Sequence, residues 1–297
     1  MTTLAAVVEA ELARPVAPAI AKAARRIAAG LGGQAVLFYG SVLRTGDLEG
    51  VLDFYVLTET PPRQGPLGRW LWPDVSYHEV AEGGRTIRAK VATMSLDRFT
   101  TAAEGRHFDT TIWARFVQPC ALAWTIDQSV ARKVREAVAA AIVTAGRYAA
   151  ALGPSRGAAR DYWKALFRAT YATEFRVEKP GREDQLLEFA GDRFDRLLPL
   201  AWNAASIVFD NHDGALAPRL HLDERRFLRR SWATRRRAGK PLNLARLAKA
   251  AFTFDGAARY ALWKIERHTG IALPLTPWRE RHPILAAPGV LWRVWRR

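Results

Sequence analysis

Short apolar runs separated by turn-forming residues fill the first third of the chain. Residues 35–39 and 51–57 are almost continuously apolar over the length of a strand, and residues 85–94 alternate between polar and apolar positions. Both patterns predict β-strands. An Ala-rich segment before them, residues 17–30, has its apolar positions at helical spacing and runs into several glycines. We therefore expect a helix that stops just before the first strand.

The segments around these strands carry turn and cap signals. Residues 61–73 are rich in Pro, Gly and Trp and are predicted to form a loop. Residues 95–97 (Ser-Leu-Asp) follow the alternating run and are predicted to open a helix, because a serine side chain can cap the first turn. Residues 112–124 are mainly apolar and are interrupted by Pro119. We expect this last segment to end in another strand.

The second half of the chain is predicted to be mainly helical. Residues 128–152, 156–175 and 182–209 all place apolar side chains at helical spacing. Gly153 and Pro154 separate the first two segments, since this pair interrupts helices. We therefore expect three long helical stretches after the strands.

These patterns predict an α+β fold in three parts. A mixed sheet with helices is expected in residues 1–127, and a helical domain in residues 128–240. Residues 241–297 are expected to form a basic, amphipathic helical C-terminal segment.

Composition places the chain among globular proteins, and its charge points to an anionic partner. It has 297 residues, of which 49% are hydrophobic and 25% charged, and its net charge is +16 with a pI near 10.7. A nucleotide, a nucleic acid or an acidic membrane surface would suit this charge. The single cysteine, Cys120, excludes an internal disulfide and fits a reducing compartment. Without a Cys/His cluster in the sequence, a structural zinc site is not expected.

Basic residues are concentrated towards the C-terminus. Residues 225–240 contain eight basic residues and no acidic one, and residues 244–268 form a predicted helix with further Arg and Lys. The final residues, 283–297, combine aromatic and basic side chains. Trp prefers the membrane interface, and Arg pairs with lipid phosphates. The predicted membrane-contacting residues are Trp292, Arg293, Trp295 and Arg296. The alternative is a terminal helix packed on the protein's own core.

The apolar pattern also bears on location. No apolar run approaches the roughly 20 residues that cross a bilayer, and the first 15 residues lack the features of a secretory signal. We expect a cytoplasmic protein, peripheral on the inner face of the membrane, with no transmembrane span.

The most informative chemistry lies where the first two predicted strands meet. The first strand ends at Gly40-Ser41, and the second carries a single carboxylate, Asp53. A Gly-Ser turn lets a polyphosphate approach backbone amides, and a carboxylate on a neighbouring strand can hold the accompanying Mg²⁺. This is the plan of the DNA polymerase β-like nucleotidyltransferases. The usual pattern has a second carboxylate two residues later, where this chain has Tyr55.

Several segments, in order, resemble one subfamily of these enzymes, the mitochondrial-type phosphatidate cytidylyltransferases of the translocator-maintenance family. The similar pieces are Tyr39-Gly40-Ser41, Asp53-Phe54-Tyr55, Lys90 on a strand before a helix, 113–119 (WARFVQP), 170–177 (TYATEFRV) and 254–260 (FDGAARY). The chain departs from the family pattern at Ala114 and Thr173, which replace Gly, and at Glu174, which replaces Asp.

The resemblance implies a nucleotidyltransferase-like first domain and a role for each matching residue. Gly40 and Ser41 would bind the nucleotide, together with Arg115 and Arg176. The catalytic set would be Asp53, Lys90 and Glu174, with Asp53 and Glu174 holding Mg²⁺. The structural alternatives are a solvated strand charge for Lys90, an ion pair for Arg115 and a surface helix pair for Glu174 and Arg176.

The implied reaction is Mg²⁺-dependent transfer from CTP to phosphatidate, an anionic lipid, to give CDP-diacylglycerol for phospholipid biosynthesis at a membrane surface. Two other functions stay open. One is a nucleic-acid-binding protein on a nucleotidyltransferase fold, which would use the basic run. The other is nucleotidyl transfer to a soluble acceptor, which leaves the Trp- and Arg-bearing tail without a role.

Overall fold

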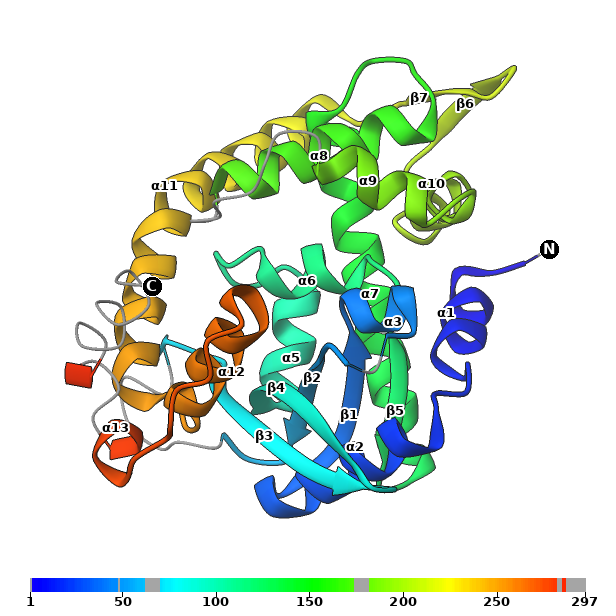
Figure 1. Ribbon diagram of the computed structural model, residues 1–297. Coiled ribbons are helices and arrows are strands. Elements are labelled where there is room, and N and C mark those ends of the chain that lie inside the picture. The colour runs from blue at the N-terminus through cyan, green and yellow to red at the C-terminus, as the bar shows by residue number, and fades with distance from the viewer. Residues whose placement is uncertain (1, 48, 62–69, 174–181, 282–284, 287–297) are drawn as a thin grey trace.

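The computed structural model describes residues 2–47, 49–61, 70–173, 182–281 and 285–286 (Figure 1). It has the predicted α+β character, with a five-stranded sheet below an arch of helices. The helices are α1 (Leu4–Leu12), α2 (Pro18–Leu31), α3 (Ser41–Thr45), α5 (Leu96–Ala103), α6 (Thr111–Phe116), α7 (Gln128–Leu152), α8 (Ala159–Thr173), α9 (Arg182–Phe189), α10 (Arg193–Ala204), α11 (Leu222–Thr253), α12 (Ala257–Thr269) and α13 (Pro277–Arg281). The strands are β1 (Gly33–Tyr39), β2 (Val51–Thr58), β3 (Asp74–Glu82), β4 (Arg85–Ser95), β5 (Ala121–Thr125), β6 (Phe209–His212) and β7 (Ala215–Pro218).

The main sheet is mixed, as predicted. Its strand order is β3-β4-β2-β1-β5. Strands β2 and β4 run parallel, and the other neighbouring pairs are antiparallel. The parallel pair brings the N-terminal halves of β2 and β4 to the same end of the sheet, close to the end of β1.

Helices cover both faces of the sheet because side chains alternate along each strand. One face buries Val36, Phe54 and Val91 under α2. The other buries Leu37 and Tyr55 and is covered by α5, α6 and α7 (Figure 1). The apolar core of this second face continues past residue 127 through α7 into α8 and α10. The divisions at residues 127 and 240 stay predictions.

The strongest local signals in the sequence correspond to observed elements. Helix α2 has proline at its first position and ends at Gly32, whose φ of 65° is left-handed. Helix α5 begins where expected, with the Ser95 hydroxyl accepting from the Arg98 amide at 3.3 Å. Helix α7 spans the predicted residues, and the Asp127 carboxylate caps it by accepting from the Val130 amide at 2.8 Å.

The prediction of one helical stretch over residues 182–209 is wrong. The segment divides into α9 and α10 at Gly191, whose φ of 55° lies in the left-handed region. Its last residue, Phe209, begins the β6–β7 hairpin. The hairpin turns at Asp213 and Gly214, both with positive φ, as two-residue turns require. Helical periodicity continues through the segment, so the apolar pattern does not reveal these breaks.

The expected helix over residues 244–268 is also interrupted. Its first part is the end of α11, and its second part is α12. Gly256, with a φ of 76°, lies at the junction. The short α6 forms within the apolar segment that was expected to end in a strand, and β5 then supplies that strand.

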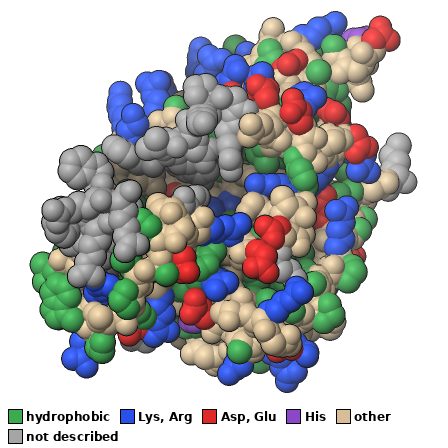
Figure 2. Space-filling model, viewed as in Figure 1, with side chains coloured by type: hydrophobic (Ala, Val, Ile, Leu, Met, Phe, Trp, Pro, Cys, Tyr) green, Lys and Arg blue, Asp and Glu red, His purple; other side chains and the backbone are tan. Residues whose placement is uncertain are grey.

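The basic run lies on α11 and contributes to a strongly cationic surface. Figure 2 shows Lys and Arg side chains spread over the visible face of the molecule. On α11 itself, Arg229, Arg230, Arg236 and Arg237 are exposed. In the described ranges, none of the helices combines the length and apolar character needed to cross a membrane. The predicted membrane contacts Trp292, Arg293, Trp295 and Arg296 lie outside the described residues.

Candidate active site

A row of four paired residues crosses the sheet and forms the base of the candidate site. Tyr39 on β1 pairs with Asp53 on β2, Asp53 with Lys90 on β4, and Lys90 with Tyr77 on β3. Paired residues of neighbouring strands project to the same side of a sheet. Asp53 and Lys90 therefore share one face, which is the face covered by α5, α6 and α7.

Gly40 is in direct contact with Asp53. A Cβ atom at position 40 would overlap Asp53 Oδ2 and lie 3.1 Å from Asp53 Cβ. Gly40 has φ 93° and ψ −163°, a conformation essentially restricted to glycine. Ser41 follows as the first residue of α3 and is exposed. The structure therefore brings the Gly-Ser turn and the strand carboxylate together, and the carboxylate occupies the space that a side chain at position 40 would need.

Three cationic side chains act on Asp53. Burial raises the pKa of the Asp53 carboxyl, while the positive charges of Lys90, Arg115 and Arg44 lower it. They come from β4, α6 and α3 respectively. A single, partly buried carboxylate among three cations creates a field that favours an anionic ligand.

Arg115 is held against the aromatic residues of the sheet. Its Nη1 donates to the Tyr39 hydroxyl at 3.0 Å, and its guanidinium lies 5.0 Å from the centre of the Tyr39 ring and 5.9 Å from that of Tyr55. Burial raises the pKa of Tyr39, with the Arg115 charge opposing it. Tyr39 therefore stays neutral at physiological pH. These contacts hold the guanidinium on the same side of the sheet as Asp53.

The strand that carries Asp53 has no second carboxylate on this face. Two residues later, Tyr55 is buried, and its ring packs against Phe99 and Phe116 at centroid distances of 6.4 and 5.2 Å. Position 55 therefore serves the hydrophobic core. The other predicted metal ligand, Glu174, and the predicted phosphate-binding residue Arg176 lie outside the described residues.

The residues present are suited to a metal that arrives with its nucleotide. Within the part of the chain that the structure describes, no three His, Cys, Asp or Glu side chains form a group that could hold a metal ion. Mg²⁺, however, often uses one or two protein carboxylates and completes its coordination with substrate phosphates and water. A single carboxylate, Asp53, with three nearby cations for the phosphates fits this arrangement.

Helix α12 packs beside the site through contacts with β3, and the periodicity of the sequence does not predict this position. The Tyr77 amide donates to the Asp255 carbonyl at 2.8 Å, which joins the start of α12 to β3. A side chain on Gly256 would lie 2.7 Å from the Tyr77 carbonyl oxygen, so the approach requires glycine. The ring of Tyr260 lies 5.4 Å from that of Tyr77, and the Asp53 charge contributes, after burial, to raising the Tyr260 pKa.

Arg44 and Tyr260 are the site residues that sequence reasoning missed. Arg44 had a detectable signal, because it lies three residues after Ser41 and hence on nearly the same side of a helix that begins there. Tyr260 belonged to a segment noted only for its family resemblance, and its position beside Asp53 depends on tertiary packing of α12.

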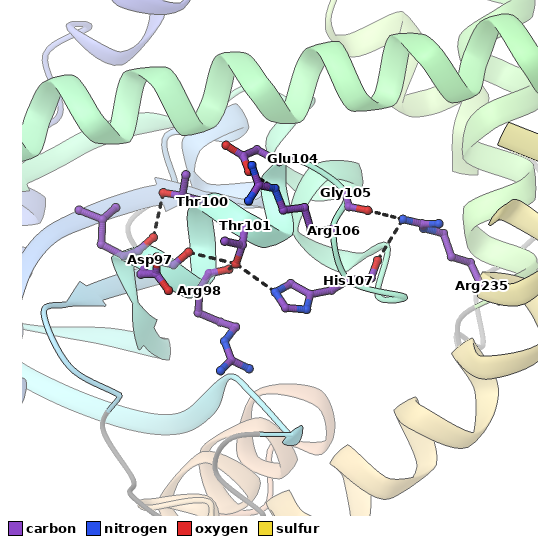
Figure 3. Close-up of polar contacts among 10 residues, drawn as sticks. Asp97, Arg98, Thr100, Thr101, Glu104, Gly105, Arg106, His107 and Arg235 are labelled. Atoms are coloured by element: carbon purple, nitrogen blue, oxygen red, sulfur yellow. Dashed lines mark hydrogen bonds and ion pairs between the residues drawn. The ribbon is translucent and has the colours of Figure 1, made fainter. Parts of the chain in front are cut away.

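One basic residue of α11 has a structural position. Figure 3 shows Arg235 pointing from α11 to the loop after α5, where its guanidinium donates to the carbonyl oxygens of Gly105 and His107. The His107 ring in turn makes a 3.0 Å hydrogen bond with the Thr101 hydroxyl. Arg235 is 5% exposed, so it ties α11 to the sheet domain and is withdrawn from any ligand-binding surface.

No protein-family model matches this chain, and no curated protein matches it in sequence. Function is therefore inferred from the geometry around Asp53 and from the motifs of the sequence.

Proposed function

We propose that this protein is a Mg²⁺-dependent nucleotidyltransferase that transfers the cytidylyl group of CTP to phosphatidate, producing CDP-diacylglycerol and pyrophosphate. The observation that carries this proposal is the contact of Gly40 with Asp53 in the presence of three cationic side chains. This arrangement combines a carboxylate that could hold a metal, an exposed Gly-Ser turn next to it and positive charge to neutralise phosphates. The order of motifs along the chain supports the choice of substrates.

Each residue has a role that follows from its position. The exposed Ser41 hydroxyl and the neighbouring backbone amides would bind the triphosphate. Asp53 would hold Mg²⁺, which supplies charge neutralisation at the phosphates. Lys90, Arg44 and Arg115 would bind phosphate oxygens and stabilise the negative charge that develops during transfer.

The acceptor needs little activation. A phosphate monoester is ionised at neutral pH, so one of its oxygens can attack the α-phosphorus of CTP without a strong general base. A new phosphorus–oxygen bond forms, and the bond to the leaving pyrophosphate breaks. Catalysis would then come mainly from positioning and from charge stabilisation by the residues around Asp53.

Action on a lipid implies contact with a membrane. The basic, Trp-containing C-terminal sequence supports a peripheral location on the inner face of the cytoplasmic membrane. The net charge of +16 would favour an anionic bilayer over a neutral one.

Product analysis tests the reaction. Purified protein is incubated with Mg²⁺, phosphatidate in mixed vesicles and each of the four nucleoside triphosphates, and lipid products are identified by mass. We expect CDP-diacylglycerol with CTP and its loss in the Asp53→Asn variant. Normal turnover by this variant would refute the assigned role of Asp53.

A second candidate function is nucleic-acid binding, which the exposed arginines of α11 favour. Liposome flotation and a nucleic-acid mobility assay at matched salt separate the two functions. Salt-sensitive RNA binding without liposome association would support the second candidate. Transfer to a soluble acceptor, such as a sugar phosphate, is distinguished by adding such acceptors to the product assay.

A further inference from the structure

A cavity of about 640 Å³ lies beside α3, and neither Asp53 nor Lys90 is among its lining residues. Its lining comes from the α1–α2 connection, α2, β1, α3, the segment before β5, and α9 with α10. Ile20, Phe38 and Val42 form a buried apolar floor, and Leu43 and Phe189 add apolar surface nearer the opening. All of these residues lie within the part of the chain that the structure describes. Such a lining suits a hydrocarbon group.

Four arginines and two carboxylates line the same cavity. Two of the arginines are engaged by the carboxylates: Arg193 forms a bidentate pair with Glu11 at 2.6 and 2.8 Å, and Arg196 lies 3.2 Å from Asp192. With four arginines against two carboxylates, the lining carries an excess of positive charge. A ligand that combines an apolar chain with an anionic group therefore matches the cavity better than a neutral or cationic one.

Arg44 connects this cavity with the candidate active site. Its guanidinium lies 5.8 Å from the centre of the Phe189 ring, and its charge lowers the pKa of Asp53. Helix α3 has five residues, so the distance from Ser41 to the cavity end of the helix is about 7 Å. An amphiphile with its chain in the cavity can therefore place its phosphate near Arg44, within about one helical turn of Gly40 and Asp53.

We infer that this cavity binds one acyl chain of the phosphate acceptor and that Arg44 holds the acceptor's phosphate at the boundary with the Asp53 site; the assignment of the ligand as the acceptor rests on the proposed function. A methylene group occupies roughly the 30 Å³ of a liquid water molecule. The cavity of about 640 Å³ then holds roughly 20 such groups. This is enough for a single long chain, and the second chain of a diacyl lipid stays outside.

The inference is tested first by direct binding, without turnover. Octyl, decyl and dodecyl phosphate are titrated below their micelle concentrations into the full-length protein by calorimetry, with inorganic phosphate and dodecyltrimethylammonium as reference ligands. We expect affinity to rise by about fourfold with each added methylene, and the cationic amphiphile to bind at least about tenfold more weakly than dodecyl phosphate. Affinity that does not depend on chain length, or equal binding of the two charge types, would overturn the inference.

Two variants change the cavity and one matched variant does not. Leu43→Glu places a carboxylate in the lining, and Phe189→Ala removes a half-exposed ring with little risk to folding. The control, Leu244→Glu, makes the same change at a 60% exposed position on α11. We expect both cavity variants to weaken dodecyl phosphate binding, Leu43→Glu by at least about tenfold, with Mg²⁺–CTP binding unchanged. If Leu43→Glu and Leu244→Glu reduce the affinity for dodecyl phosphate equally, the inference is contradicted. It is also contradicted if the cavity variants lose affinity for Mg²⁺–CTP but not for dodecyl phosphate.

The outcomes separate this inference from the proposed function. If no CDP-diacylglycerol forms, the proposed reaction is wrong. If alkyl phosphates still bind with an affinity that depends on chain length and that Leu43→Glu abolishes, the cavity is nevertheless supported as an amphiphile site. Conversely, equal transfer to phosphatidate by the wild type and by Leu43→Glu supports the reaction and overturns the role of the cavity.

Discussion

Substitution of Gly40 by alanine is the most direct structural test of the candidate site. The backbone at Gly40 has φ 93° and ψ −163°, which costs an L-residue on the order of 1–3 kcal/mol. In addition, the new methyl group would overlap Asp53 Oδ2 and lie 3.1 Å from Asp53 Cβ. We expect Gly40→Ala to destabilise the protein by about 2–4 kcal/mol and to displace the Asp53 carboxylate.

Gly32→Ala is the matched control. Gly32 also has a positive φ, 65°, but its added Cβ would have no atom within 4 Å. This variant should lose only about 1–2 kcal/mol from backbone strain. Urea denaturation measures both stabilities, and calorimetry measures Mg²⁺–CTP binding at a temperature where both variants are folded. Only Gly40→Ala should lose binding.

A double variant separates the overlap from the strain. In an Asp53→Ala background the carboxylate oxygens are absent, so Gly40→Ala should cost less than it does in the wild type, and the difference measures the contact. The reasoning is refuted if folded Gly40→Ala binds Mg²⁺–CTP with wild-type affinity, since nucleotide binding would then not depend on the position of the Asp53 carboxylate.

Three further predictions concern stability and reactivity. The folded-state pKa of Asp53 lies above its ordinary value, so its ionisation favours the unfolded state, and the free energy of unfolding should rise as pH falls through that pKa. Asp53→Asn should therefore raise the thermal midpoint at pH 7 while abolishing nucleotidyl transfer. A lower midpoint would contradict this. Glu11→Gln leaves the 8% exposed Arg193 without its carboxylate and should cost about 3–5 kcal/mol in urea denaturation, whereas a loss below about 1 kcal/mol would show the pair to be dispensable. Burial raises the pKa of Cys120 to about 12, so its alkylation by iodoacetamide at pH 8 should be slow in the folded protein and fast in urea; equal rates would contradict this.

Elements with strong local signals were predictable from the sequence, and edge or docking elements were not. The apolar runs of β1 and β2 and the periodicity of α7 are properties of the segments themselves. Strand β3 was missed, because it is an edge strand whose residues, DVSYHEVAE, mix charged and apolar side chains. The separation of α9 from α10 depends on the conformation of Gly191, which an apolar pattern does not encode.

The residues of the candidate site likewise include some that the sequence predicts and some that it does not. The proximity of Gly40 and Asp53 follows from two strand-like runs joined by a short connection, and the pairing of Tyr39 with Asp53 agrees with it. Lys90 was identified from a family pattern, and its place opposite Asp53 depends on the parallel pairing of β2 and β4. Tyr260 lies far along the chain and reaches the site only because Asp255 pairs with β3, so no local pattern reveals it.

The charges around Asp53 suggest why metal and nucleotide would have to bind together. Lys90, Arg115 and Arg44 repel a bare Mg²⁺, and the Asp53 carboxylate repels a bare triphosphate. The Mg²⁺–nucleotide complex satisfies both, since its phosphates meet the cations and its metal meets the carboxylate. CTP affinity should therefore fall at least about tenfold in EDTA, and Asp53→Asn should reduce this dependence by making the site more positive. A wild-type site that binds CTP equally well with and without Mg²⁺ would be an anion site in which Asp53 is only a structural carboxylate.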